Sequence, residues 1–90
     1  MSNLDDLNKH VTAAIFRVEA AQRRLSRIEE EIAKITLPDS VEGRIARRGA
    51  VRAAVAGRDF ERARELVSRF VREDGIDDVL IDELNKLLQT

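Results

Sequence analysis

Apolar residues in the first third of the chain recur at alternating spacings of three and four. This pattern predicts one long helix over residues 2–36. A straight helix drifts by about 20° per heptad against a strict seven-residue repeat, so the repeat predicts a left-handed coiled coil with another helix. We predict that these ten positions form the interface of a homodimer: Leu4, Leu7, Val11, Ala14, Val18, Ala21, Leu25, Ile28, Ile32 and Ile35.

The charged residues that flank the repeat leave the orientation of the two helices open. Arg24 and Glu29 would attract one another across a parallel pair. Arg17 would instead lie opposite Glu31 in an antiparallel pair. Both arrangements are compatible with flanking ion pairs in coiled coils.

Further apolar residues lie outside the repeat in the middle of the same helix, namely Ile15, Phe16 and Ala20. A helix that is apolar on all sides is usually buried on all sides. We therefore expect residues 40–90 to fold back, at least in part, on the middle of this helix. The alternative is that they pack at one of its ends.

Residues 40–90 contain three shorter helical patterns, which we expect at about 41–56, 59–73 and 77–89. Pro38 disfavours helix before it. Asp39 or Ser40 can cap the next helix, and Glu42 would complete a capping box with Asp39. Glycines at 57 and 75 and aspartates at 59 and 77 mark the later ends and beginnings.

The third pattern has an apolar stripe at Phe60, Ala63, Val67 and Phe70, which we expect to face the core. The stretch RDFERA, residues 58–63, resembles the turn between the two helices of a tetratricopeptide repeat. No second copy is found, whereas such arrays need about three repeats. An ordinary antiparallel hairpin is the simpler interpretation, with small residues of 41–56 facing larger ones of 59–73.

Composition agrees with a single all-α domain over residues 1–90. The chain is 43% apolar and 37% charged, with three phenylalanines and no cysteine. This composition favours helices and excludes disulfides. The longest stretch without charge, 11–16, is too short for a membrane span or a signal-peptide core. We expect a cytoplasmic protein that does not bind membranes.

Candidate catalytic and metal-binding groups are few. His10 is the only histidine and has no suitably spaced partner. Glu29, Glu30 and Glu31 are consecutive, so on a helix they point in different directions, and we expect a solvated face. The sequence DGIDD at 74–78 fits a helix end and a new beginning better than a calcium loop. We predict no enzymatic activity and no cofactor or metal.

Four arginines form the one basic cluster that could bind a partner: Arg44, Arg47, Arg48 and Arg52. Their spacing places them on neighbouring faces of one helix, where guanidinium groups can clamp phosphates or an acidic protein surface. They can equally pair with carboxylates of the following helices. Nucleic acid is the weaker alternative because the net charge is −1 and no aromatic residue stands nearby.

We therefore predict a non-enzymatic protein–protein interaction module, such as an adaptor, a regulatory subunit or a small chaperone, that dimerises through the heptad helix. One alternative is a dimeric nucleic-acid-binding regulator that uses the four arginines. Another is a structural assembly protein, since supercoiled helices also build filaments.

Overall fold

The computed structural model describes residues 3–89, and all regular secondary structure in that range is helical. They are α1 (Asn3–Lys34), α2 (Val41–Ala56), α3 (Phe60–Phe70) and α4 (Asp78–Leu87). The predicted all-α class, with a long first helix and three shorter ones, is confirmed. Residue 2, where the first helix was expected to begin, lies outside the described residues. Within the described range no helix is long and apolar enough to cross a membrane.

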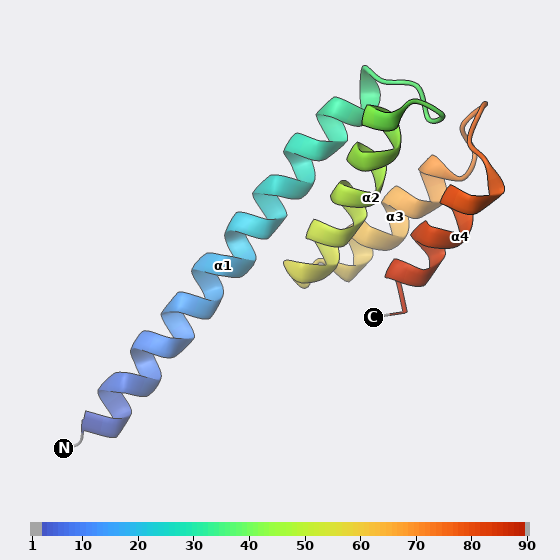
Figure 1. Ribbon diagram of the computed structural model, residues 1–90. Coiled ribbons are helices and arrows are strands. Elements are labelled where there is room, and N and C mark those ends of the chain that lie inside the picture. Colours follow the sequence, from blue (N-terminus) through green and yellow to red (C-terminus); the bar gives the residue numbers. More distant parts are fainter. Residues whose placement is uncertain (1–2, 90) are drawn as a thin grey trace.

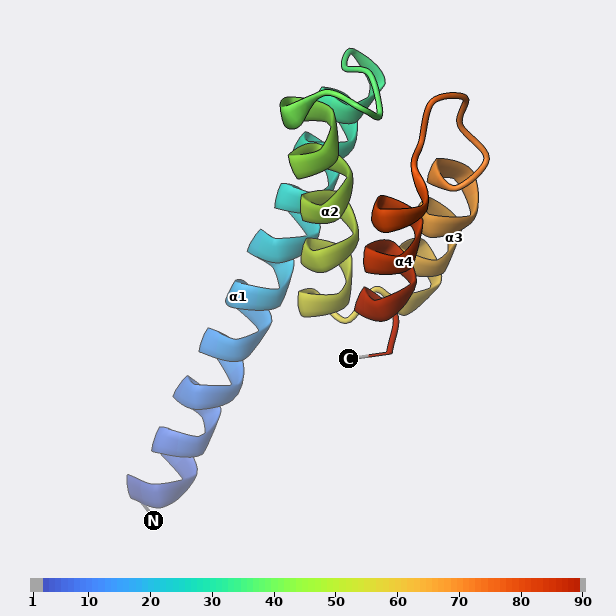
Figure 2. The ribbon, with the colours of Figure 1, turned by 45° about the vertical axis from the view of Figure 1, so that its right-hand side comes forward.

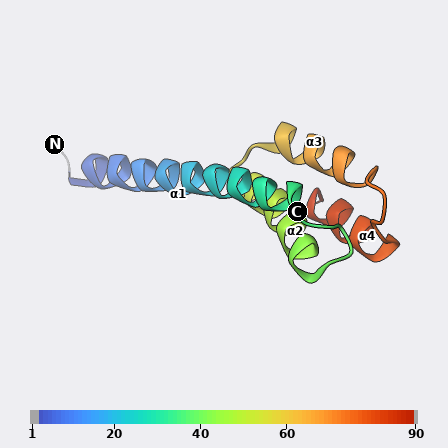
Figure 3. The same ribbon diagram turned by 90° about the horizontal axis from the view of Figure 1, so that it is seen from above.

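The helices run up, down, up and down, and α2 lies in the centre (Figure 1). It packs against all three other helices, as the turned view also shows (Figure 2). The first half of α1 extends away from this group, which gives the molecule a length of 59 Å (Figure 3). We call residues 3–18, of which only Ala13 is partly buried, the N-terminal arm.

The expected folding back is therefore only partial: α2 runs back along the C-terminal half of α1 as far as Glu19, but it does not cover Ile15 and Phe16. Ile15 and Phe16 are 52% and 62% exposed. The reason is the length of α2. It starts just after α1 ends and runs back for 16 residues, so it reaches only to the level of Glu19, where Gly57 meets the α1 backbone.

Side-chain caps define the beginnings of the three shorter helices. Ser40 Oγ accepts the Gly43 N–H at 2.9 Å. Asp59 and Asp77 cap α3 and α4 in the same way, at 3.2 and 2.8 Å. Ser40 is thus the cap, and the alternative capping box of Asp39 with Glu42 does not form. Each cap satisfies an N–H that the first helical turn leaves unpaired.

The core lies where α2, α3 and α4 meet, with one contribution from α1. As expected, small residues of α2 face larger ones of α3. The buried apolar residues of this cluster are Ala33, Ala46, Ala50, Val51, Ala54, Ala63, Leu66, Val67, Phe70, Leu80 and Leu84.

Phe60 is not part of the core, in contrast to the predicted stripe on α3. Its side chain is 41% exposed, and the Arg58 guanidinium lies 5.7 Å from the centre of its ring. Phe60 is the first residue of α3, at the corner of the hairpin where α2 has already ended. The helix period placed it correctly on the apolar face, but no neighbouring helix extends far enough to cover it.

Two glycines of α2 differ in what surrounds them. A Cβ at Gly43 would lie 1.8 Å from the carbonyl oxygen of Leu37. The three atoms nearest to a Cβ at Gly49 would all belong to the side chain of Glu29, at 3.0–3.2 Å. The first contact is with backbone that cannot move without shifting the α1–α2 loop, whereas the second is with a flexible side chain.

Replacing these glycines by alanine should therefore destabilise the fold to very different extents. Gly43→Ala should lower the free energy of unfolding by about 2 kcal/mol or more because of the backbone clash. Gly49→Ala should change it by less than about 1 kcal/mol, since the gain in helix propensity offsets the displacement of Glu29. Urea unfolding at one fixed protein concentration measures both. Equal losses for the two variants would contradict this account of the packing.

Candidate functional site

The ten heptad residues are all exposed, nine of them on α1 and Ile35 directly after its last residue, and together we call them the heptad surface. Among its large side chains, the exposed fraction ranges from 38% for Ile32 to 84% for Ile35. Ala14 and Ala21 are exposed as well. A continuous row of exposed leucine, isoleucine and valine along one helix is unusual for a surface that faces only water.

A different face of α1 attaches the helix to the rest of the chain, and it is polar. Ser26 is fully buried, and its hydroxyl donates to the Ala50 carbonyl oxygen at 2.7 Å. Arg23 donates to the Gly57 carbonyl oxygen at 2.7 Å. Ala33 is the only buried apolar residue of α1. Hydrogen bonds, more than apolar contacts, therefore join α1 to α2.

The sequence carried a signal for this attachment that apolar periodicity did not detect. The attaching residues Glu19, Arg23, Ser26, Glu30 and Ala33 are spaced four, three, four and three apart. They form a second stripe on α1, composed mainly of polar side chains. The apolar stripe of the helix thus stays unused within the single chain.

Arg47 is the most buried of the four predicted arginines, with 1% of its surface exposed. Its Nε and Nη2 donate to the two carboxylate oxygens of Glu73, each at 2.8 Å. The same guanidinium donates to the carbonyl oxygens of Ala33, Thr36 and Gly43 at 3.0–3.1 Å. It also lies 5.6 Å from the centre of the Phe70 ring. Arg47 is therefore not accessible to a partner.

Two other arginines of this set pair with the region around α4. Arg44 forms a hydrogen-bonded ion pair with Asp77, and a longer one of 3.8 Å with Glu83. Arg48 lies 3.4 Å from Glu83. The backbone N–H of Leu80, followed by the Arg44 guanidinium, lowers the pKa of Asp77 below its ordinary value. Three of the four arginines thus pair with Glu73, Asp77 and Glu83, which agrees with the alternative of pairing within the chain.

Arg52 differs from the other three arginines. It is exposed and forms no ion pair with any residue between 3 and 89. It lines a shallow depression beside Arg48, Glu83 and Lys86. One free guanidinium next to two paired cations and a carboxylate is a much weaker anion site than four convergent arginines.

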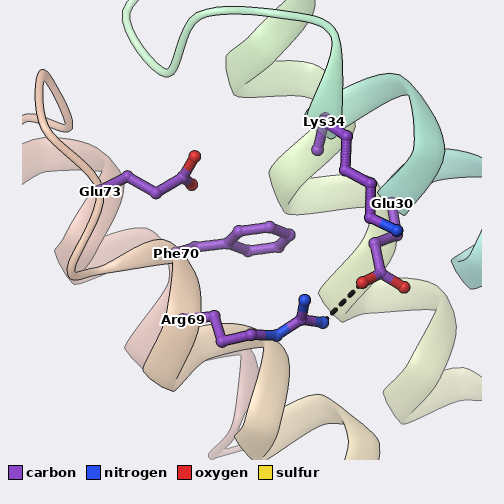
Figure 4. A pocket seen from close by; sticks show the side chains of 6 residues that line it. Glu30, Lys34, Arg69, Phe70 and Glu73 are labelled. Atoms are coloured by element: carbon purple, nitrogen blue, oxygen red, sulfur yellow. Dashed lines mark hydrogen bonds and ion pairs between the residues drawn. The ribbon is translucent and has the colours of Figure 1, made fainter.

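The pocket between α1 and α3 is lined by charged side chains that are already paired (Figure 4). Glu30 accepts from Arg62 at 2.7 Å and from Arg69 at 2.6 Å. Burial alone would raise the pKa of Glu30, but the hydrogen bonds from Arg69 and Arg62 outweigh it and lower the pKa below 4.5. With Glu73 bound to Arg47, this pocket presents no unpaired acid, base or nucleophile.

The other candidate groups are dispersed. His10 is exposed on the N-terminal arm. The three consecutive glutamates do point apart, but they do not form one solvated face. Glu31 is solvated, Glu29 packs near Gly49, and the side chain of Glu30 is only 12% exposed. Within residues 3–89 no three histidine or acidic side chains converge as metal ligands would.

No protein-family model matches the chain, and neither a curated protein nor a solved structure matches it. The surfaces described above are therefore the basis for any functional proposal.

Arg47 and Arg52 lie on the same helix but differ in burial, so substituting each of them tests whether Arg47 has a structural role. Arg47→Met should lower the free energy of unfolding by about 3–5 kcal/mol, because it leaves Glu73 without its buried partner and removes a donor from the carbonyl oxygens of Ala33, Thr36 and Gly43. Arg52→Met removes the same charge from an exposed position and should change the free energy by less than about 0.5 kcal/mol. Chemical denaturation followed by circular dichroism measures both. A stable Arg47→Met variant would refute the central role of this residue.

The lowered pKa of Glu30 predicts a loss of stability in acid. A carboxylate whose folded pKa lies below its unfolded value stabilises the fold above the unfolded value, and the contribution fades as pH falls through the folded pKa. Unfolding free energy should therefore decrease from about pH 5 downwards, starting near the ordinary pKa of 4.5. Glu30→Gln should flatten this decrease, whereas Glu65→Gln, at a side chain 68% exposed, should leave it unchanged.

Proposed function

We propose that the chain is a non-enzymatic protein–protein interaction module that self-associates through the heptad surface of α1. One observation carries the proposal: the apolar stripe of α1 is exposed along its whole length, while a separate polar stripe attaches the helix to α2. Burying each leucine, isoleucine or valine contributes about 1.5–3 kcal/mol. A second copy offers a surface of identical length and repeat.

The N-terminal arm supports the same proposal. Over residues 3–18 the helix packs against none of α2, α3 and α4, yet the apolar repeat continues through Leu4, Leu7, Val11 and Ala14. Isolated helices of about 12–15 residues are marginal in water. Pairing with another helix would stabilise this arm as well as cover it.

The role as adaptor, regulatory subunit or small chaperone, and a cytoplasmic location, are predictions that rest on the sequence. The ion pairs of Arg44, Arg47 and Arg48 support a structural role for these residues. Of the four arginines, this leaves Arg52 to bind phosphate in the nucleic-acid alternative. The alternative of a structural assembly protein uses the same heptad surface. It differs from the proposal because it predicts oligomers larger than a dimer.

Sedimentation at micromolar concentration tests the proposal with a matched pair of variants. Val18 and Val79 are 60% and 63% exposed, the first on the heptad surface and the second on α4. Val18→Glu should convert a dimer into a folded monomer because it places two carboxylates in an apolar interface. Val79→Glu should remain dimeric.

Three results would count against self-association as proposed. A monomeric wild-type chain would refute it, and so would a Val18→Glu variant that is still dimeric. Growth beyond a dimer with rising concentration would favour the assembly alternative instead. Circular dichroism of both variants verifies that the helices are retained.

A further inference from the structure

We infer that the second copy packs antiparallel, with Ala14 of each copy facing Ile32 of the other. This inference rests on the proposed function and specifies how the same surface is used. Three features of the chain carry it: the sizes of the residues along the heptad surface, the charges beside it, and the position of α2–α4 on one half of α1.

Side-chain size favours the antiparallel arrangement. A parallel pair places each heptad residue against itself, so Ala14 faces Ala14 and Ala21 faces Ala21. Such layers are too thin for the spacing that the neighbouring layers of Val11, Val18 and Leu25 require. In the antiparallel register, each alanine instead faces a large residue of the second copy, Ala14 with Ile32 and Ala21 with Leu25. Val18 then faces Ile28, and Val11 faces Ile35, which makes all layers similar in width.

The charged residues that flank the heptad surface also favour the antiparallel arrangement. This register brings Arg17 next to Glu31 of the second copy, twice by symmetry. The side chain of Glu31 is 71% exposed, and its one ion pair among residues 3–89 is with Lys34, at 3.4 Å, so it is available. The pair that a parallel dimer would use depends on Glu29, which is half-buried against Gly49 of α2. The two Arg24 side chains approach each other at the symmetry axis, a repulsion that solvent screens because both are exposed.

The position of α2–α4 agrees with a reversed partner. These helices support only the C-terminal half of α1, and the N-terminal arm has no support (Figure 1). An antiparallel partner lays each arm along the supported half of the other copy. Leu4 and Leu7 then extend past the end of the partner's α1, where Leu37 and Val41 are 70% and 69% exposed. Those two residues have no other apparent role in the single chain.

The absence of cysteine from the chain makes a cross-linking test straightforward. Ala14→Cys and Ile32→Cys would be purified separately, then oxidised alone and as an equal mixture. In the antiparallel register the two copies of either residue lie about 27 Å apart. A disulfide needs Cα atoms within about 7 Å, so neither variant should link to itself. The mixture should yield a covalent dimer that contains one copy of each variant, identified by mass spectrometry.

Each possible result decides the question. Mixed disulfides alone support the inference. Self-linked dimers of each variant would overturn it in favour of a parallel pair, and the proposed self-association would stand. A dimer in sedimentation that forms no disulfide in any sample would overturn the register. Monomeric behaviour of the reduced proteins would refute both the inference and the proposed function. Both positions are exposed in the single chain, so neither substitution perturbs its core.

Discussion

The fold depends most on the buried guanidinium of Arg47. It joins three parts of the chain at once: the end of α1 and the residues just after it through Ala33 and Thr36, its own helix through Gly43, and the segment that follows α3 through Glu73. The Ala33 carbonyl oxygen accepts bonds of 3.3 Å from Thr36, and Arg47 adds a shorter one of 3.0 Å to it and one of 3.1 Å to the Thr36 carbonyl oxygen. Burying such a charge is costly unless every N–H is satisfied, and here the bidentate carboxylate and the carbonyls satisfy them. The hydrogen bonds of the Arg47 guanidinium therefore fix the end of α1 and the way α2 and α3 lie against it.

A second constraint is the closeness of α1 and α2, which small residues make possible. Glycines at 43, 49 and 57 and alanines at 46, 50 and 53 line the side of α2 that approaches α1 and the core. Because the backbones lie so near, side chains of α1 can reach main-chain carbonyls of α2, as Ser26 does with Ala50 and Arg23 with Gly57. The polar attachment of α1 thus depends on the small residues of α2. A side chain at Gly57, whose Cβ would lie 2.9 Å from the Glu19 carbonyl oxygen of α1, would separate the helices and break those hydrogen bonds.

Local signals predicted much of this architecture from the sequence. Pro38, Ser40, Asp59 and Asp77 placed the helix beginnings within one or two residues, because caps depend on a few neighbouring atoms. What could not be predicted depends on which helix covers which face. Arg47 and Arg52 look alike in the sequence, yet one is buried and the other free, since only the first lies over the end of α1. Phe60 and Glu30 were misjudged for the same reason: the helix period gives the face of a residue but not the length or charge of its neighbour.

In α1, the apolar stripe that the heptad pattern defines is not the face by which the helix packs within the single chain. Apolar periodicity is normally interpreted as the face that a helix turns toward its own core. In α1 the core-facing stripe is instead polar, and the apolar stripe lies about a third of a turn or more away from it around the helix axis. A chain that needed only its own fold would have little use for eight large apolar side chains in a row that stays exposed in the structure of residues 3–89. Two stripes with different chemistry on one helix are most simply understood as two interfaces, one made within the chain through hydrogen bonds and one reserved for another helix through apolar contact.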